Sequence, residues 1–171
     1  MTSAPSQPQF DRSDFGNAAL FQHFLNGTML YDHIRNSWFY WEDGRWHRDV
    51  KDYAFHRMGQ IMRYRQGIAH TFQSKEEQDA EWRWARNSQK SGFMQSALRI
   101  AAASPEMQTP EWDIDPMVLG AANGVLNLNS GRLKKQKQSD PIFLKTQVEF
   151  DDKAKCPRWL SYLTEVFGDT E

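Results

Sequence analysis

The chain has 171 residues, a formal net charge of −1, and seven tryptophans, eleven phenylalanines and five tyrosines. This is enough for one domain with a real core, because a chain near 150 residues hides roughly two-thirds of its unfolded surface. The single cysteine, Cys156, excludes an internal disulfide, and the sequence lacks the run of roughly 20 apolar residues that a membrane helix needs. Without a signal peptide, the protein is expected to be cytoplasmic, with residues 1–12 as a disordered tail or linker.

Positive charge is concentrated in two places along the chain. Residues 45–70 carry six Lys/Arg against two acids, and residues 132–145 carry five against one, so each stretch has a local charge of +4. If folding brings these basic islands together, they form a positive face suited to nucleic acid; otherwise they are two ordinary solvated surfaces. The candidate DNA-binding residues are Arg45, Trp46, Arg48, Arg57, Arg63, Arg65, Lys134, Lys135 and Lys137.

The first half of the chain reads as a helix, a hairpin and two further helices. Apolar residues recur at helical spacing after Asp14 or Asn17, either of which can cap a helix that ends at Gly27. Asp43-Gly44 lies between aromatic runs and predicts a β-hairpin over residues 38–48. A helix is expected from about 49 to 71, with Arg57, Arg63 and Arg65 mostly off its apolar face.

A longer helix is expected to follow. Ser74 and Glu77 have the spacing of a capping box, and the helix should continue to Ser104-Pro105, with Gly92 weakening or bending its middle. Its Trp82 and Trp84, two residues apart, must point in different directions, so one of them either faces a neighbouring domain or subunit or is simply part-exposed.

The last third of the sequence is β-rich and ends in a helix. A second hairpin is expected from strands 124–128 and 132–134, joined by Asn129-Ser130-Gly131, with one or two short strands over 142–150. The final helix begins near Pro157 and stops at Gly168, with Trp159, Leu160, Leu163 and Phe167 on one side. The predicted fold class is α+β: a helix-dominated single domain with two small β-hairpins.

Few motifs in the chain have the pattern of a catalytic centre. The phosphate-binding loop of ATPases is missing, and one cysteine with five scattered histidines does not form a zinc site. Asp113 and Asp115 alternate as metal-binding carboxylates do, but Pro116 favours a turn. Cys156 has no neighbouring histidine, so it reads as a buried or incidental thiol. The predictions are therefore no catalytic residue, no metal and no cofactor in this chain.

The aromatic hairpin has two interpretations. Exposed rings could stack on single-stranded bases, worth roughly 1–3 kcal/mol per base, with Arg45 and Arg48 on phosphates. Alternatively Trp38, Tyr40 and Trp46 form the core face of the sheet, and we expect this for at least half of them.

Several short patterns occur in one order and together resemble a known family, the poxvirus-primase-type N-terminal domain of superfamily 3 helicases, found in phage, plasmid and viral primase-helicases. The resemblance covers residues 12 to 171. It rests on Phe15-Gly16-Asn17-Ala18 with Phe21, the stretch from Trp38 to Asp49, Asp113-Ile114-Asp115-Pro116-Met117-Val118-Leu119, the run from Asn123 to Gly131, and Cys156-Pro157-Arg158-Trp159-Leu160. Gly120-Ala121-Ala122 departs from the bulkier run that relatives often have, a local loop change.

The resemblance implies that residues 13–171 precede an AAA+ ATPase that forms rings and unwinds DNA, acting in a bacterial or phage-infected cell. ATP and Mg²⁺ are expected only for that ATPase, and Asp113 and Asp115 are expected in a structural turn. The implied role is non-catalytic: assisting DNA binding, helicase loading or ring assembly in DNA replication. Expected partners are single-stranded or forked DNA, the protein's own ATPase domain and neighbouring protomers, without a membrane.

Two other functions stay open from the residues themselves. One is a protein-interaction scaffold that couples primase to helicase without touching DNA. The other is a metal-dependent nucleotidyltransferase that uses Asp113 and Asp115.

Overall fold

A computed structural model describes residues 10–168, and these fall into two compact units. The first unit extends to Ile114 and also includes Lys137–Phe143, and the second contains Asp115–Gln136 and the chain from Leu144 onward. Helices and two small antiparallel sheets make up both units, which confirms the predicted helix-dominated α+β class. Most of the predicted tail lies outside the described residues, but residues 10–12 do not belong to a loose tail, because Arg65 and Glu81 bind them.

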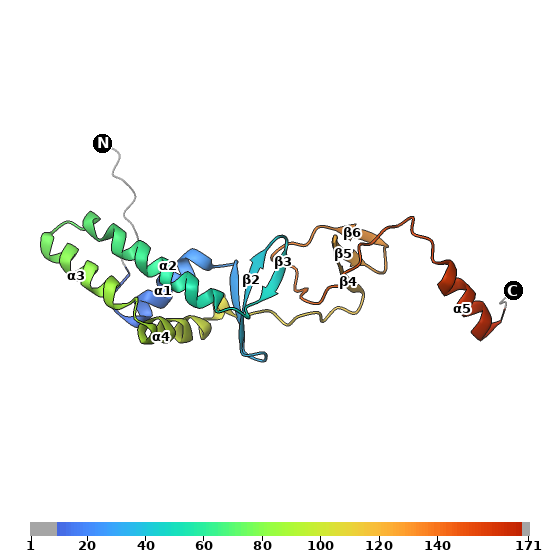
Figure 1. Cartoon of the computed structure of the whole chain (residues 1–171), viewed down its shortest axis with the longest axis horizontal. Coiled ribbons are helices and arrows are strands. Elements are labelled where there is room, and N and C mark those ends of the chain that lie inside the picture. Colours follow the sequence, from blue (N-terminus) through green and yellow to red (C-terminus); the bar gives the residue numbers. More distant parts are fainter. Residues whose placement is uncertain (1–9, 169–171) are drawn as a thin grey trace, which may run out of the picture. The chain divides into compact units, whose positions relative to one another are not determined.

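Four α-helices form most of the first unit, and Figure 1 shows them grouped beside its sheet. They are α1 (Asp14–Leu25), α2 (Tyr53–Gly67), α3 (Lys75–Asn87) and α4 (Ser91–Ala102), with short 3-10 turns η1 (Ile68–Thr71) and η2 (Pro105–Met107). The N-cap of α1 is Ser13, whose hydroxyl accepts from the Gly16 amide, and not Asp14 or Asn17 as predicted. Asn17 lies within α1, where its buried side chain bonds Ser88 and Arg65.

The predicted aromatic hairpin is confirmed and belongs to a three-stranded antiparallel sheet. Its strands are β1 (Met29–Asp32), β2 (Ser37–Glu42) and β3 (Arg45–Arg48), in the order β1-β2-β3. Asp43 and Gly44 turn the chain with positive φ angles of 50° and 72°, as the Asp-Gly signal predicts. No strand is predicted between the first helix and the hairpin; β1 forms there because β2 offers it a full row of partners, from Met29–Tyr40 to Asp32–Ser37.

Both faces of this sheet are covered, which explains its continuous aromatic run. Alternate residues of β2 point to opposite faces: Trp38 and Tyr40 pack against the helical core, whereas Phe39 and Trp41 pack with Trp112. The helical core includes Phe21, Met29, Met58, Met62 and Met107, each almost completely buried.

The prediction of one long helix over residues 74–104 is wrong, because this stretch forms two helices. Ser74 caps α3 as expected, its hydroxyl accepting from the Glu77 amide. The helix is interrupted at Ser88–Lys90, however, and a new helix, α4, begins at Ser91. Gly92 is inside α4 and is not the break. Ser88 is fully buried and its hydroxyl accepts from the Asn17 side chain, so a contact with a distant helix sets the break.

The second unit contains a small sheet and one helix. Its strands β4 (Val118–Ala121), β5 (Gly124–Asn127) and β6 (Arg132–Lys134) pair antiparallel in that order, which confirms the second hairpin and adds β4 to it. The short strands expected over 142–150 do not form; the β pairing of this segment is an isolated bridge between Gly120 and Lys145. α5 (Pro157–Phe167) starts and stops as predicted, with Gly168 at its end.

Across residues 10–168, no helix combines the length and the apolar character needed to cross a membrane.

Candidate nucleic-acid interface

A continuous row of cationic and aromatic side chains runs from β3 across β2 onto α2. Arg45 Nε donates to His47 Nε2 at 3.1 Å, and the His47 ring stacks on Tyr40 with centroids 5.2 Å apart and planes 14° from parallel. Tyr40 in turn packs on Tyr53, the first residue of α2, at 4.5 Å. We call the row from Arg45 to Arg63 the β3–α2 strip.

On α2 the strip continues with the helical repeat. The Arg57 guanidinium lies 5.6 Å from the centroid of the Tyr53 ring, a cation–π contact, and donates to the Gln60 side chain at 3.1 Å. The Gln60 side chain also contacts the His56 ring at 3.1 Å. Exposed Arg63 lies three residues after Gln60, so the two residues are neighbours on the helix surface. From Arg45 to Gln60 the side chains of the strip are thus held by one another, which lowers the entropy cost of presenting their charges. Arg63 is placed by its position on α2.

Burial and charge both act on the phenol at the centre of the strip. Desolvation, together with the carboxylates of Glu42 and Asp49, raises the pKa of Tyr40 above its ordinary value, so the phenol stays neutral. Glu42, the last residue of β2, pairs with Arg45, and Asp43 lies in the turn between them. The positive charge of the strip is therefore concentrated at its α2 end, on Arg57 and Arg63.

The N-terminus of α2 is already occupied by a carboxylate of the protein. Asp49 Oδ1 accepts from the amides of Lys51 and Tyr53, at 3.1 and 2.8 Å, and Oδ2 accepts from Ala54 at 2.8 Å. Free helix amides would bind an anion. Because Asp49 takes them, a phosphate at this surface would have to be held by the arginine side chains.

The structure brings together part of the predicted DNA-binding set. Arg45, Arg48 and Arg63 are exposed, and Arg57 is half-buried in the contacts described above. Arg48 donates to the carbonyl of Arg35, in the turn between β1 and β2, at 3.2 Å. Alternation along β3 places its side chain on the face of Trp46, opposite to Arg45.

Trp46 is not available as a base-stacking residue, which corrects the prediction. Its side chain is only 4% exposed, packed edge-on against Trp41 and Trp112, and its indole N–H donates to the Gln138 carbonyl at 3.2 Å. Trp38 and Tyr40 are half-buried against the helical core. The core interpretation of these rings is therefore correct.

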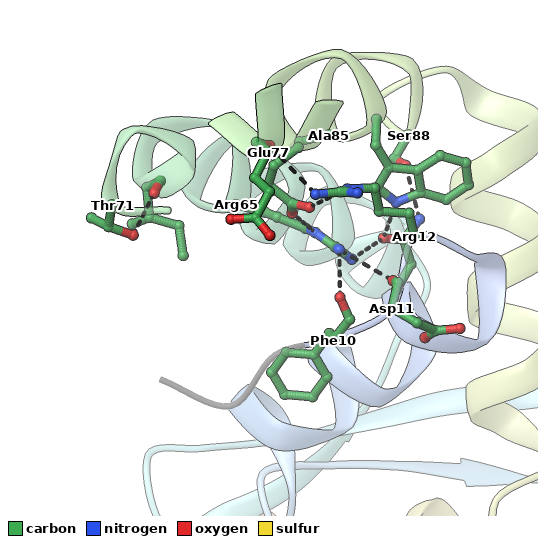
Figure 2. A network of polar contacts seen from close by, with 12 residues as sticks. Phe10, Asp11, Arg12, Arg65, Thr71, Glu77, Ala85 and Ser88 are labelled. Carbon is green, nitrogen blue, oxygen red and sulfur yellow. Dashed lines mark hydrogen bonds and ion pairs between the residues drawn. The ribbon is translucent and has the colours of Figure 1, made fainter. Parts of the chain in front are cut away.

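Arg65 is likewise not a surface arginine. It is 3% exposed and pairs with buried Glu81, and three further N–H groups donate to the Asn17 side chain at 3.0 Å and to the Phe10 and Asp11 carbonyls. Arg12 reaches the other Glu81 oxygen at 3.0 Å, and Figure 2 shows Arg12 and Arg65 converging on this network. Arg65 is withdrawn from the DNA-binding set, because it is buried and four of its N–H groups already donate inside the unit. Its partners lie too far away in sequence for local patterns to have revealed them.

The second basic island belongs mostly to the second unit. Lys134 and Lys135 are exposed there at and beyond the end of β6, whereas exposed Lys137 belongs to the first unit. Lys137 lies in a tight turn in which its amide donates to the Asp140 carboxylate at 2.9 Å.

Asp113 and Asp115 lie in turns, as the resemblance implies. Asp113 has a positive φ of 57°, and its carboxylate accepts from the Phe143 amide at 3.0 Å; the Asp115 carboxylate accepts from the Met117 amide at 2.9 Å. Within the described part of the chain, no group of three or more His, Cys, Asp or Glu side chains is placed to hold a metal ion.

The Asn-Gly-Val stretch holds the second unit together. The Asn123 amide donates to the Phe150 carbonyl at 2.9 Å, and its oxygen accepts from the Phe150 amide at 3.0 Å. Gly124 lies so close to β6 that an added Cβ would be 2.3 Å from the Lys134 carbonyl oxygen. Position 123 therefore needs a side-chain amide, and position 124 needs a glycine.

The comparison with family models gives a match to the D5 N-terminal-like family over residues 18–168. The chain belongs to this family. D5 N-terminal-like domains are the N-terminal domains of phage and viral primase-helicases, which confirms the resemblance and associates the chain with DNA replication. A search of curated proteins found no match.

Three other residues considered in the sequence of this D5 N-terminal-like chain are Trp82, Trp84 and Cys156. Trp82 is 41% exposed and carries the Arg86 guanidinium 5.2 Å from its ring centroid. Trp84 points elsewhere, packing on Phe93 and donating weakly to Asn17 at 3.4 Å. Cys156 is exposed at the start of α5, and not buried.

Proposed function

We propose that this domain contacts the sugar–phosphate backbone of DNA through the β3–α2 strip and so helps a primase-helicase engage its substrate. The observation that supports this is the strip itself: Arg45 and Arg57 lie along one row of polar and aromatic side chains that contact one another, and exposed Arg63 follows on α2. ATP and Mg²⁺ would act at the ATPase of the parent protein, and no residue of this chain is proposed to bind them.

The strip is better suited to phosphates than to bases. Its aromatic rings are stacked on one another and half-buried, so they have little free face for a nucleobase. Arginine instead presents a planar fork of donors that matches a phosphate. Binding should therefore be independent of DNA sequence and strongly dependent on salt, because each phosphate contact releases counterions.

The test is fluorescence anisotropy with labelled single-stranded, duplex and forked DNA, titrated with the full chain at several salt concentrations. We expect saturable binding whose logarithm falls linearly with log salt, at about 0.7 per contact on single strands and about 0.9 on duplex. The double charge reversal Arg57→Glu with Arg63→Glu should lower the affinity for every DNA form and reduce the slope by about two contacts.

The matched control is Arg83→Glu with Arg86→Glu, which makes the same change in net charge on exposed positions of α3. The proposal requires that the strip variant lose clearly more affinity than this control. Equal losses would mean that only net charge matters, and a wild-type chain that binds none of the three DNAs at low salt would exclude DNA contact by this domain.

A further inference from the structure

α5 separates its side chains by polarity, and its apolar side is exposed within the second unit. At 100° per residue, its large apolar residues share one side of the helix, and Arg158, Ser161, Thr164 and Glu165 share the other. None of the residues described for α5 is buried, and Trp159 and Phe167 are 57% and 72% exposed. An apolar stripe of this width is typical of a helix that packs against another apolar surface. The stripe consists of Trp159, Leu160, Tyr162, Leu163, Val166 and Phe167.

The polar side of α5 indicates what kind of surface covers the stripe. Membrane-surface helices carry many Lys and Arg on the polar face, and a nucleic-acid contact also needs excess positive charge. α5 has one cation, Arg158, and one anion, Glu165, which cancel. This balance favours an apolar protein groove with charges at its rim, the helix-in-groove mode of recognition.

The first unit contains such a groove, between α1 and α4. It encloses about 560 Å³ and is lined mainly by small residues: Ala18 and Ala101 are buried in it, and Ala19 and Ala103 lie exposed along it. Phe15 stands beside it with 71% of its surface exposed. Small residues leave the depressions into which large side chains of another helix fit.

The rim of the groove carries one charge of each sign, as does α5. Arg99 lines the groove, and Glu106 lies next to it, accepting hydrogen bonds from the lining residues Gln22 and Ser104. These hydrogen bonds hold the pKa of Glu106 below its ordinary value, so its carboxylate is charged at neutral pH. Arg99 can therefore meet Glu165, and Glu106 can meet Arg158.

We propose that α5 of one copy docks in the α1–α4 groove of a second copy of this chain. Large apolar residues meet an alanine-lined groove, and each charge meets its opposite, so one molecule carries both halves of a matching contact. The contact is head-to-tail, because the two surfaces differ, and such contacts build rings or open chains. The proposal is independent of DNA contact by the β3–α2 strip, which uses other residues.

Analytical ultracentrifugation of the full chain over a wide concentration range tests the association itself. We expect the average mass to rise above that of the monomer as concentration increases. Leu160→Asp on the apolar stripe and Ala19→Glu in the groove should each abolish this rise. Their matched controls, Thr164→Asp on the polar side of α5 and Gln95→Glu on exposed α4 surface, should not. A wild type that stays monomeric throughout would overturn the proposal.

A charge exchange tests the pairing. Arg99→Glu and Glu165→Arg should each weaken association several-fold, because like charges then meet at the rim. An equimolar mixture of the two variants should recover the wild-type behaviour, since every contact between unlike copies again pairs opposite charges. Failure of the mixture to recover would exclude this register of helix and groove.

Cross-linking separates a second copy from other occupants. Cys156 is the only cysteine and is exposed at the start of α5, so a benzophenone attached to it reports what lies beside the helix. In a mixture of ¹⁴N- and ¹⁵N-labelled chains, links between differently labelled copies that map to residues 15–22 or 99–104 support the proposal. Links only within one copy would mean that α5 returns to its own groove, and links to other regions would place it on a different surface; either result overturns the proposal.

Discussion

The guanidinium of Arg65 donates to the carboxylate of Glu81, and both side chains are almost completely buried in the first unit. The pair joins α2 to α3, and Arg65 extends it to α1 through Asn17 and to the chain before α1 through the Phe10 and Asp11 carbonyls. An ion pair of this kind makes a single-partner substitution costly, because the remaining charge keeps its desolvation penalty without its full compensation.

Arg65→Ala should therefore lower the free energy of unfolding by about 3 kcal/mol or more. Lys75→Ala, which breaks the exposed Lys75–Asp79 pair on α3, should cost less than about 0.5 kcal/mol. Urea denaturation of both variants followed by circular dichroism gives the comparison. A similar small loss for the two would show that Arg65 is not a structural residue.

Two glycines should respond to alanine in opposite directions. Gly124→Ala should destabilise the second unit, since the new Cβ would lie 2.3 Å from the Lys134 carbonyl oxygen and the backbone would have to move. Gly92→Ala, in the first turn of α4 with nothing within 4 Å of the added atom, should stabilise the first unit by up to about 1 kcal/mol. Thermal unfolding measures both, and a stabilising Gly124→Ala would contradict the close approach of β5 and β6.

Acid should destabilise the first unit partly through Asp32. Burial raises the pKa of this carboxyl, but hydrogen bonds from the Arg35 amide and guanidinium outweigh burial and leave the pKa below its ordinary value of 3.8. A depressed folded-state pKa contributes stability above pH 3.8 that is lost as the pH falls through the folded value.

Asp32→Asn removes this titration. The variant should be less stable than the wild type at neutral pH but lose less stability between pH 4 and lower values, as about one proton fewer is taken up on unfolding. Urea titrations at a series of pH values check the slope. An unchanged acid slope would mean that other carboxyls carry the acid sensitivity.

Asn123 should control the order of the segment that returns along β4. Asn123→Ala removes both hydrogen bonds to Phe150, so the Phe150 amide should exchange with solvent much faster. Asn127→Ala, which affects only the Ser130 turn, should leave that amide protected. Hydrogen exchange followed by NMR distinguishes the two, and persisting protection in Asn123→Ala would show that other contacts hold the segment.

Features whose causes lie within a few residues were predictable from sequence. The turn at Asp43-Gly44 needs only a positive φ, the start of α3 needs only the Ser74 hydroxyl, and α5 begins at Pro157 and ends at Gly168. The Asn123–Gly131 stretch and the other family patterns also sufficed to recognise the family that the comparison confirms. Each of these signals is short, because a single serine hydroxyl, proline ring or glycine sets the local backbone conformation.

Tertiary structure decided which charged and aromatic side chains remain on the surface. Arg65 and Arg63 look alike in sequence, yet the first is buried because its partners Asn17 and Glu81 come from other helices, whereas the second is exposed. The indole N–H of Trp46 donates to a carbonyl 92 positions away in the sequence. The interruption between α3 and α4 at Ser88 depends on a hydrogen bond from Asn17. The sequence by itself determined the local turns, the helix ends that one nearby residue sets, and the family; which side chains the β3–α2 strip exposes was decided by folding, since burial depends on neighbours that are distant along the chain.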